Sequence, residues 1–277
     1  MGQSALRLLL ICDTMCNEKS EQLSEYLSSI GKAALAFSGG TDSYFLLWAC
    51  RQSGVDVKPY FVKGAFQTQE ESVHAVAAAS ALGMDLSVLE VDTLSFEEVV
   101  ENSADRCYLC KRRVFSLILE RACSDGYDIV MDATNASDDP SVRPGMRALT
   151  ELGIRSPLRE CDITKPELRE LSKAAGLDNW DTPSNSCLAT RIPMGTRITA
   201  EDLQKVEYVE SRLKIFGLRD FRLRSFGDRA RLETVPGEES FVEENRSEIE
   251  MIVLSRYRQI EFGTRVPGLR CFVNRLS

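Results

Sequence analysis

Short apolar runs alternate with helical segments along most of the chain. Residues 33–37, 57–62, 86–91 and 128–132 are apolar runs of strand length, and helical spacing of apolar residues follows each of them. Runs that are hydrophobic throughout are typical of strands buried on both faces, as in parallel sheets. The alternation therefore predicts an α/β fold with a doubly wound, mostly parallel sheet covered by helices.

The expected helices are bounded by local start and stop signals. Three pairs have the spacing of a capping box, in which a hydroxyl residue precedes a glutamate by three positions: Thr68 with Glu71, Ser95 with Glu98, and Thr164 with Glu167. Together with the apolar spacing, these signals predict helices over 17–30, 42–53, 68–83, 95–102, 107–121, 143–152 and 164–175.

The pattern changes after residue 193. The expected elements there are a helix over 199–217, strands over 220–226 and 229–235 with a turn at Gly227-Asp228, a helix over 238–258 and a strand near Cys271. Two domains follow. Residues 1–193, with an N-terminal helix, form the larger α/β domain, and residues 194–277 form a smaller α+β domain for substrate binding or oligomerisation.

The segment Ser38-Gly39-Gly40-Thr41-Asp42-Ser43 joins the first expected strand to its helix. Two adjacent glycines allow backbone N–H groups to surround an anion, and the helix N-terminus adds a favourable dipole. The segment is neither the G-x-x-x-x-G-K-[ST] loop nor the G-x-G-x-x-G loop. Because ligands bind at the carboxyl edge of parallel sheets, its position predicts a phosphate-binding loop rather than a plain turn.

Composition narrows the function classes. The formal charge is −8 with a pI near 5.0, which argues against a dedicated nucleic-acid binder. No apolar run approaches the roughly 20 residues of a membrane span, and we expect a cytoplasmic protein. Nine cysteines in that compartment are not a disulfide framework, and Cys50, Cys123 and Cys271 are expected to be small packing residues.

Three other cysteines have a different pattern. Cys107 and Cys110 form a C-x-x-C pair at a helix start, and Cys187 follows the last expected strand of the same domain. They could be incidental, and a zinc site would need a fourth ligand that His74, the only histidine, is badly placed to give. A 4Fe-4S cluster with one open iron needs only three cysteines.

The loop resembles the S-G-G-x-D-S signature of the PP-loop ATP pyrophosphatases, which have the adenine nucleotide alpha hydrolase-like fold. The resemblance implies that ATP and Mg²⁺ bind, that ATP is cleaved between its α- and β-phosphates, and that AMP passes to an acceptor oxygen. The superfamily includes amide-forming synthetases, argininosuccinate synthetase and sulfur-inserting enzymes, and the loop alone does not choose among them.

Longer stretches are similar to the LarE family of ATP-dependent sulfur transferases, which make the thiocarboxylates of the nickel-pincer cofactor of lactate racemase. The resemblance implies a pyridinium carboxylate mononucleotide as substrate and a homo-oligomer. The matching stretches are residues 36–43, 106–111, 132–135, 143–145, 153–158 and 186–193, with a weaker match over 221–224 and 231–233.

The resemblance also implies roles for individual residues. Some family members give up the sulfur of one cysteine at the position of Cys187, whereas others carry three cysteines and a 4Fe-4S cluster, and this chain resembles the second kind. The implied sites are Cys107, Cys110 and Cys187 for the cluster and catalysis, and Ser38, Gly39, Gly40, Asp42, Ser43, Lys111, Thr134 and Asn135 for ATP and pyrophosphate.

Three arginines are candidates for the phosphate of the substrate, because guanidinium groups pair with phosphate through two hydrogen bonds. They are Arg191, Arg222 and Arg224, although the last two also fit a solvated hairpin face. Other functions stay open: a PP-loop tRNA thiolation enzyme, an amide-forming synthetase with bystander cysteines, and a nucleotide sensor that releases no pyrophosphate.

Overall fold

The computed structural model describes residues 18–183 and 185–265, and the chain divides into two compact units. Unit 1 comprises the residues up to Lys63, Gln69–Glu90 and Cys110–Ser184, and unit 2 comprises Gly64–Thr68, Val91–Leu109 and the residues from Asn185 onward. The sequence predicted one division after residue 193, whereas two internal segments of the N-terminal half belong to unit 2. In the described part of the chain, no helix is both long and apolar enough for a membrane span.

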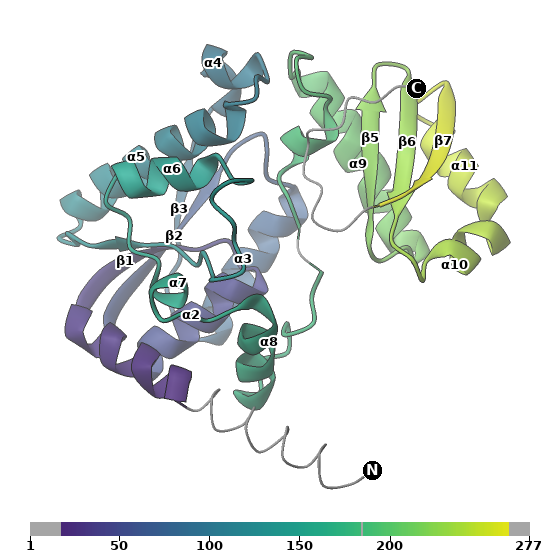
Figure 1. Cartoon of the computed structure of the whole chain (residues 1–277). Helices are drawn as coiled ribbons and strands as arrows, with labels where there is room; N and C mark the ends of the chain where they lie inside the picture. The colour runs from purple at the N-terminus through teal and green to yellow at the C-terminus, as the bar shows by residue number, and fades with distance from the viewer. Residues whose placement is uncertain (1–17, 184, 266–277) are drawn as a thin grey trace, which may run out of the picture. The chain divides into compact units, whose positions relative to one another are not determined.

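Unit 1 is built on sheet A, whose four strands are all parallel and lie in the order β3-β2-β1-β4. This confirms the predicted α/β fold with a parallel sheet. Figure 1 labels β1, β2 and β3 of this sheet. The strands are β1 (Lys32–Ala36), β2 (Asp56–Lys63), β3 (Ser87–Glu90) and β4 (Val130–Met131). β4 is shorter than the predicted run over 128–132.

Helices cover both faces of sheet A. Successive residues of each strand point to opposite faces, and both faces are apolar, so both are buried against helices. On one face Leu35 packs with Phe45 in one hydrophobic cluster, and on the other face Ala34 packs with Phe115 in a second cluster. The helices of unit 1 are residues 18–30, α2 (Thr41–Gln52), α3 (Gln69–Ala81), α5 (Arg106–Ser124, whose first turn belongs to unit 2), α6 (Gly145–Glu151), α7 (Pro157–Glu160) and α8 (Lys165–Ala174).

The strand order of sheet A changes direction between β1 and β4. From β1 the chain adds β2 and then β3 on one side, and β4 later pairs with the other side of β1. In open parallel sheets, such a switch point leaves a crevice at the carboxyl ends of the two central strands, and ligands bind there. The segments after β1 and β4 therefore meet at one place.

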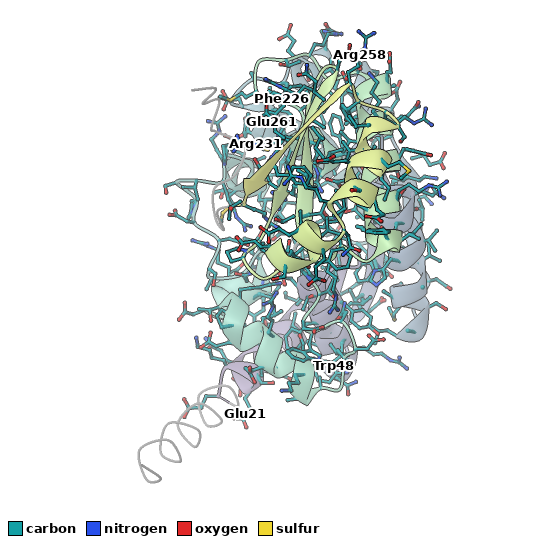
Figure 2. All side chains as sticks on the ribbon, turned by 90° about the vertical axis from the view of Figure 1, so that its right-hand side faces the viewer. Glu21, Trp48, Phe226, Arg231, Arg258 and Glu261 are labelled. Carbon is teal, nitrogen blue, oxygen red and sulfur yellow. The ribbon has the colours of Figure 1, made fainter. Side chains whose placement is uncertain are left out.

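Unit 2 is built on sheet B, with the order β5-β6-β7, in which β5 and β6 are antiparallel and β6 and β7 parallel. α9 and α11 pack on the face that carries Leu223 and Leu232, and Figure 2 shows Arg231 and Glu261 on the side away from α11. The elements are α9 (Ala200–Phe216), β5 (Phe221–Phe226), β6 (Arg229–Thr234), α10 (Glu239–Glu244), α11 (Arg246–Leu254) and β7 (Gln259–Thr264).

The remaining segments of unit 2 are joined by a buried asparagine. Asn102 has a positive φ of 57°, and its Nδ2 donates to the carbonyl oxygens of Pro193 at 2.7 Å and Thr196 at 3.0 Å. These bonds tie residues 91–109 to the chain after residue 185. The short elements here are η1 (Thr93–Ser95), α4 (Glu97–Val100) and η2 (Leu188–Arg191).

Some predicted boundaries are wrong. Ser95 does not cap a helix with Glu98, because it ends η1 and its hydroxyl donates to the carbonyl of Asp92. The helix predicted over 238–258 is broken at Asn245, whose side chain bonds the carbonyl of Phe241. α7 and β7 were not predicted, and the strand predicted near Cys271 lies outside the described residues.

Candidate active site

The loop after β1, residues 38–43, is the one predicted to bind phosphate, and it is called the phosphate loop from here on for that prediction. Gly39 has a φ of +75°, and a Cβ at this position would lie 2.9 Å from the Cα of Ala75 on α3. Only glycine fits there without displacing the loop, because other residues rarely adopt this φ and the neighbouring atom is helix backbone.

Two serines brace the phosphate loop. The hydroxyls of Ser38 and Ser43 lie 3.1 Å apart, and the backbone N–H of Ser38 donates to Ser43 Oγ at 3.2 Å. Gly40 is the N-cap residue of α2, and no side chain caps this helix end. The N–H groups of the first turn are therefore left for other acceptors, as an anion site requires.

Asp42, on the first turn of α2, lies between a cation and an amide. Lys165 Nζ forms an ion pair with Oδ1 of Asp42, and Asn135 Nδ2 donates to Oδ2 at 2.9 Å. The structure thus brings the predicted residues Asp42 and Asn135 together, from the loops after β1 and β4. Lys165 was not predicted. The sequence does carry one sign of its role: Lys165 lies in the first turn of α8, where the helix dipole disfavours a positive charge that has no partner.

A buried carboxylate organises the segment after β4. Asp132 accepts hydrogen bonds from the backbone N–H of Thr134 at 3.3 Å, from the Thr134 hydroxyl and from Ser156 Oγ at 2.6 Å. Lys111 Nζ lies 3.9 Å from Asp132 Oδ2. Two predicted ATP-site residues, Lys111 and Thr134, therefore contact one carboxylate, and Asp132 was not predicted as a site residue in its own right.

The cysteines of the described residues are buried, half-buried or exposed. Cys123 is exposed, so the prediction that it is a packing residue is wrong, and Cys271 lies outside the described residues. Burial raises the pKa of Cys50 to about 12 and that of Cys161 to about 11, so both thiols are protonated at neutral pH. Cys107 and Cys110 are half-buried and lie one turn apart on α5, so they share one helix face. Cys187 is half-buried and is the N-cap residue of η2.

Arg106 links two of the predicted cysteine segments. Its Nη1 donates to the carbonyl of Ala189 on η2 at 2.8 Å, and its Nη2 lies 3.6 Å from Cys107 Sγ. Within residues 18–183 and 185–265, no three His, Cys, Asp or Glu side chains form a group that could hold a metal ion. The three-cysteine site stays a prediction.

Arg191 forms many contacts within unit 2. Its side chain is 3% exposed, and its Nε and Nη2 pair with the two carboxylate oxygens of Glu210 at 2.9 and 3.0 Å. Nη1 donates to Ser186 Oγ at 2.9 Å, and Glu210 also accepts the N–H of Leu223 at 2.9 Å. In this arrangement Arg191 anchors the segment around Cys187 to α9 and β5, and a substrate phosphate would have to compete with Glu210 for it.

Arg222 and Arg224 lie two residues apart on β5 and so share the face of sheet B opposite the core. Arg222 is buried. Arg224 Nε donates to Glu233 Oε2 at 2.9 Å, and its Nη1 donates to the carbonyl of Thr190 on η2. Both arginines remain predictions as phosphate ligands, and Arg224 also ties β5 to η2.

Comparison with known proteins decides the family. No protein-family model matches the chain. It is 31% identical to the pyridinium-3,5-bisthiocarboxylic acid mononucleotide synthase of Lactiplantibacillus plantarum, over 78% of this chain and 79% of that protein. The chain belongs to the LarE family.

Two further relatives of this LarE-family chain are uncharacterized. It is 33% identical to a protein of Synechocystis sp. over 80% of this chain and 83% of that protein. It is also 30% identical to a protein of Methanocaldococcus jannaschii, over 73% of this chain and 77% of that protein.

Proposed function

We propose that this LarE-family chain is an ATP-dependent sulfurtransferase that converts a substrate carboxylate into a thiocarboxylate during synthesis of the nickel-pincer cofactor. The substrate would be a pyridinium carboxylate mononucleotide. The observation that carries the proposal is the meeting of the phosphate loop with Asn135 and Lys165 at the switch point of sheet A, in a chain that is 31% identical to a synthase of the corresponding bisthiocarboxylate.

The phosphate loop would hold the β- and γ-phosphates of ATP. The backbone N–H groups after Gly39 and the uncapped first turn of α2 supply donors, and Lys165 supplies positive charge where pyrophosphate leaves. Asp42 is the carboxylate in the first turn of α2 and would bind Mg²⁺ or its waters, because Mg²⁺ prefers oxygen ligands. Attack by the substrate carboxylate on the α-phosphorus then forms an acyl adenylate and releases pyrophosphate.

In the second step a C–S bond replaces the C–O bond to AMP, and the former carboxylate oxygen leaves with AMP. Cys107, Cys110 and Cys187 would hold a 4Fe-4S cluster, and a bound cluster would supply the sulfide. All three thiols are half-buried, and Cys107 and Cys110 share a helix face. Arg191 and Arg106 position the Cys187 and Cys107 segments within unit 2. No histidine base is needed, because a sulfur anion is already a strong nucleophile.

The test follows the two half-reactions separately. Protein purified without oxygen is incubated with ATP, Mg²⁺ and the pyridinium dicarboxylate mononucleotide, and pyrophosphate and thiocarboxylate are both measured. We expect acceptor-dependent pyrophosphate release and roughly four irons per chain. Release that depends on tRNA, or a stoichiometric zinc, would replace the proposal with another PP-loop chemistry.

Cysteine variants test the sulfur step. Cys107→Ser, Cys110→Ser and Cys187→Ser are each expected to abolish thiocarboxylate formation while pyrophosphate is still released. The matched control is Cys123→Ser, since Cys123 is an exposed cysteine on the same helix α5. Full thiocarboxylate formation in all four variants would show that the cysteines are bystanders. A homo-oligomer and a cytoplasmic location also belong to the proposal.

A further inference from the structure

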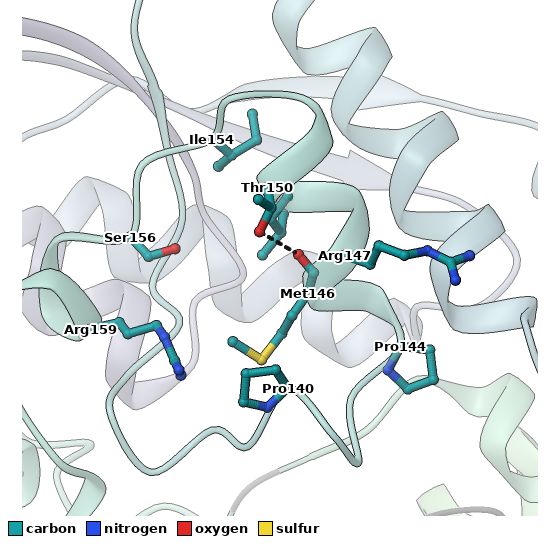
Figure 3. A pocket seen from close by; sticks show the side chains of 9 residues that line it. Pro140, Pro144, Met146, Arg147, Thr150, Ile154, Ser156 and Arg159 are labelled. Atoms are coloured by element: carbon teal, nitrogen blue, oxygen red, sulfur yellow. Dashed lines mark hydrogen bonds between the residues drawn. The ribbon is translucent and has the colours of Figure 1, made fainter.

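Unit 1 contains a cavity of about 450 Å³ between α6 and the loops on either side of it (Figure 3). Its lining is mostly apolar, with Pro140, Met146 and Ile154 among the wall residues. Ser156 and Arg159 supply polar groups to the wall. Small-molecule sites typically have volumes of about 300–1,000 Å³ and combine apolar walls with a few polar groups, and this cavity has both properties.

Direct contacts connect the cavity wall to the candidate active site. Ser156 Oγ donates to Asp132 Oδ1 at 2.6 Å, and Asp132 is the first residue after β4. Arg159 donates to the carbonyl of Asp138, whose carboxylate accepts the N–H of Asn135 at 3.2 Å. Asn135 in turn bonds the phosphate loop, so the cavity lies on the β4 side of the loop and within unit 1.

The chemistry of the wall favours an anionic, flat ligand. Guanidinium groups bind carboxylates through two parallel hydrogen bonds, and Arg159 supplies one guanidinium to the wall, whereas that of Arg147 extends away from the cavity in Figure 3. Met146 and Pro140 offer polarisable and flat surfaces for a ring, and Figure 3 shows them beside Arg159. An adenine ring is neutral and would not use the charge of Arg159, whereas a ring with carboxylates would.

We propose that this cavity binds the carboxylated ring of the acceptor, with Arg159 pairing with a ring carboxylate. The proposal rests on the proposed function and adds a location for the acceptor. It places the acceptor on the opposite side of β1 from β2 and β3, so that its carboxylate approaches the phosphate loop from the β4 side.

The test uses pyridine-3,5-dicarboxylate as the probe and isothermal titration calorimetry with the full chain. Arg159→Lys removes the bidentate hydrogen-bond donor and keeps the charge. This substitution is expected to weaken probe binding at least tenfold. Thr150→Phe fills the mouth of the cavity from an exposed helix position, and the same loss is expected. The matched control, Arg121→Lys on α5, should bind like the wild type, and ATP binding should stay within twofold in every variant.

The outcomes separate this proposal from the proposed function. If the wild type does not bind the probe, or if Arg159→Lys and Thr150→Phe bind it normally, the cavity is not the acceptor site. If the probe binds as expected but no acceptor-dependent pyrophosphate release occurs, the cavity stands and the proposed reaction fails. With active enzyme, a raised KM for the acceptor and an unchanged KM for ATP in both variants would support the proposal.

Discussion

Gly39→Ala tests the phosphate loop, because this residue combines two constraints that can be measured separately. Its φ of +75° costs a residue with a side chain about 1–2 kcal/mol. The added Cβ would also lie 2.9 Å from the Cα of Ala75, whereas non-bonded carbon atoms attract at about 3.5–4.0 Å. The loop must therefore move by roughly half an ångström or more.

Gly31→Ala is the matched control for the backbone cost. Gly31 has a φ of +69°, and a Cβ there would meet nothing within 4 Å. Alanine also lowers the entropy of the unfolded chain by about 0.4–1 kcal/mol, so we expect a net loss near 1 kcal/mol and a fall in Tm of about 2–4 °C. ATP turnover of Gly31→Ala should equal that of the wild type.

For Gly39→Ala we expect a larger fall in Tm and a decrease of roughly 100-fold in kcat/KM for ATP, because displacing a catalytic group by about 1 Å can cost that much. Thermal unfolding and pyrophosphate release measured on the three proteins give both quantities. If Gly39→Ala turned over ATP as fast as Gly31→Ala, the loop would not hold the phosphates and the reasoning would be refuted.

Three further predictions concern charged side chains. Lys165→Met should raise the KM for Mg-ATP about 10-fold to 100-fold in steady-state assays, since a charge-assisted hydrogen bond contributes about 1.5–3 kcal/mol, and Lys165→Arg should recover part of the loss. Glu210→Ala should lower the stability of unit 2 in urea by about 3–5 kcal/mol, because Arg191 would keep a buried charge without its partner. Burial opposes ionisation of Glu160, but hydrogen bonds from Arg155 and Tyr26 outweigh it and lower the pKa of Glu160 from 4.5 to about 2. The stability that this lowered pKa contributes is therefore present above about pH 4.5 and is lost as the pH falls toward 2. Melting experiments on Glu160→Gln should show that this part of the acid dependence is gone.

The sequence predicted the features that short-range patterns determine. The glycine turn between β1 and α2, the capping box of Thr164 and Glu167 and the hairpin turn at Gly227 depend on neighbouring residues, and all three are present where expected. Phosphate binding by the glycine turn stays a prediction. The alternation of strands and helices gave the parallel sheet of unit 1, because burial on both faces leaves a clear apolar pattern.

The missed features depend on residues far apart in the chain. Lys165 and Asp42 are 123 positions apart, and only the strand order brings them together. Asn102 is polar, buried and of positive φ, and its partners lie about 90 residues away. The break at Asn245 was missed because the apolar spacing continues through it.

The interleaving of the two units has a consequence for synthesis. Residues 91–109 leave the ribosome well before residues 185–198, which contain the carbonyl groups that Asn102 binds. Chains often fold domain by domain from the N-terminus as they emerge. Here the first turn of α5, with Cys107 on it, must wait for its partners until nearly two hundred residues have been made. Premature release or cleavage in the 185–198 stretch would leave Asn102 and this turn without them.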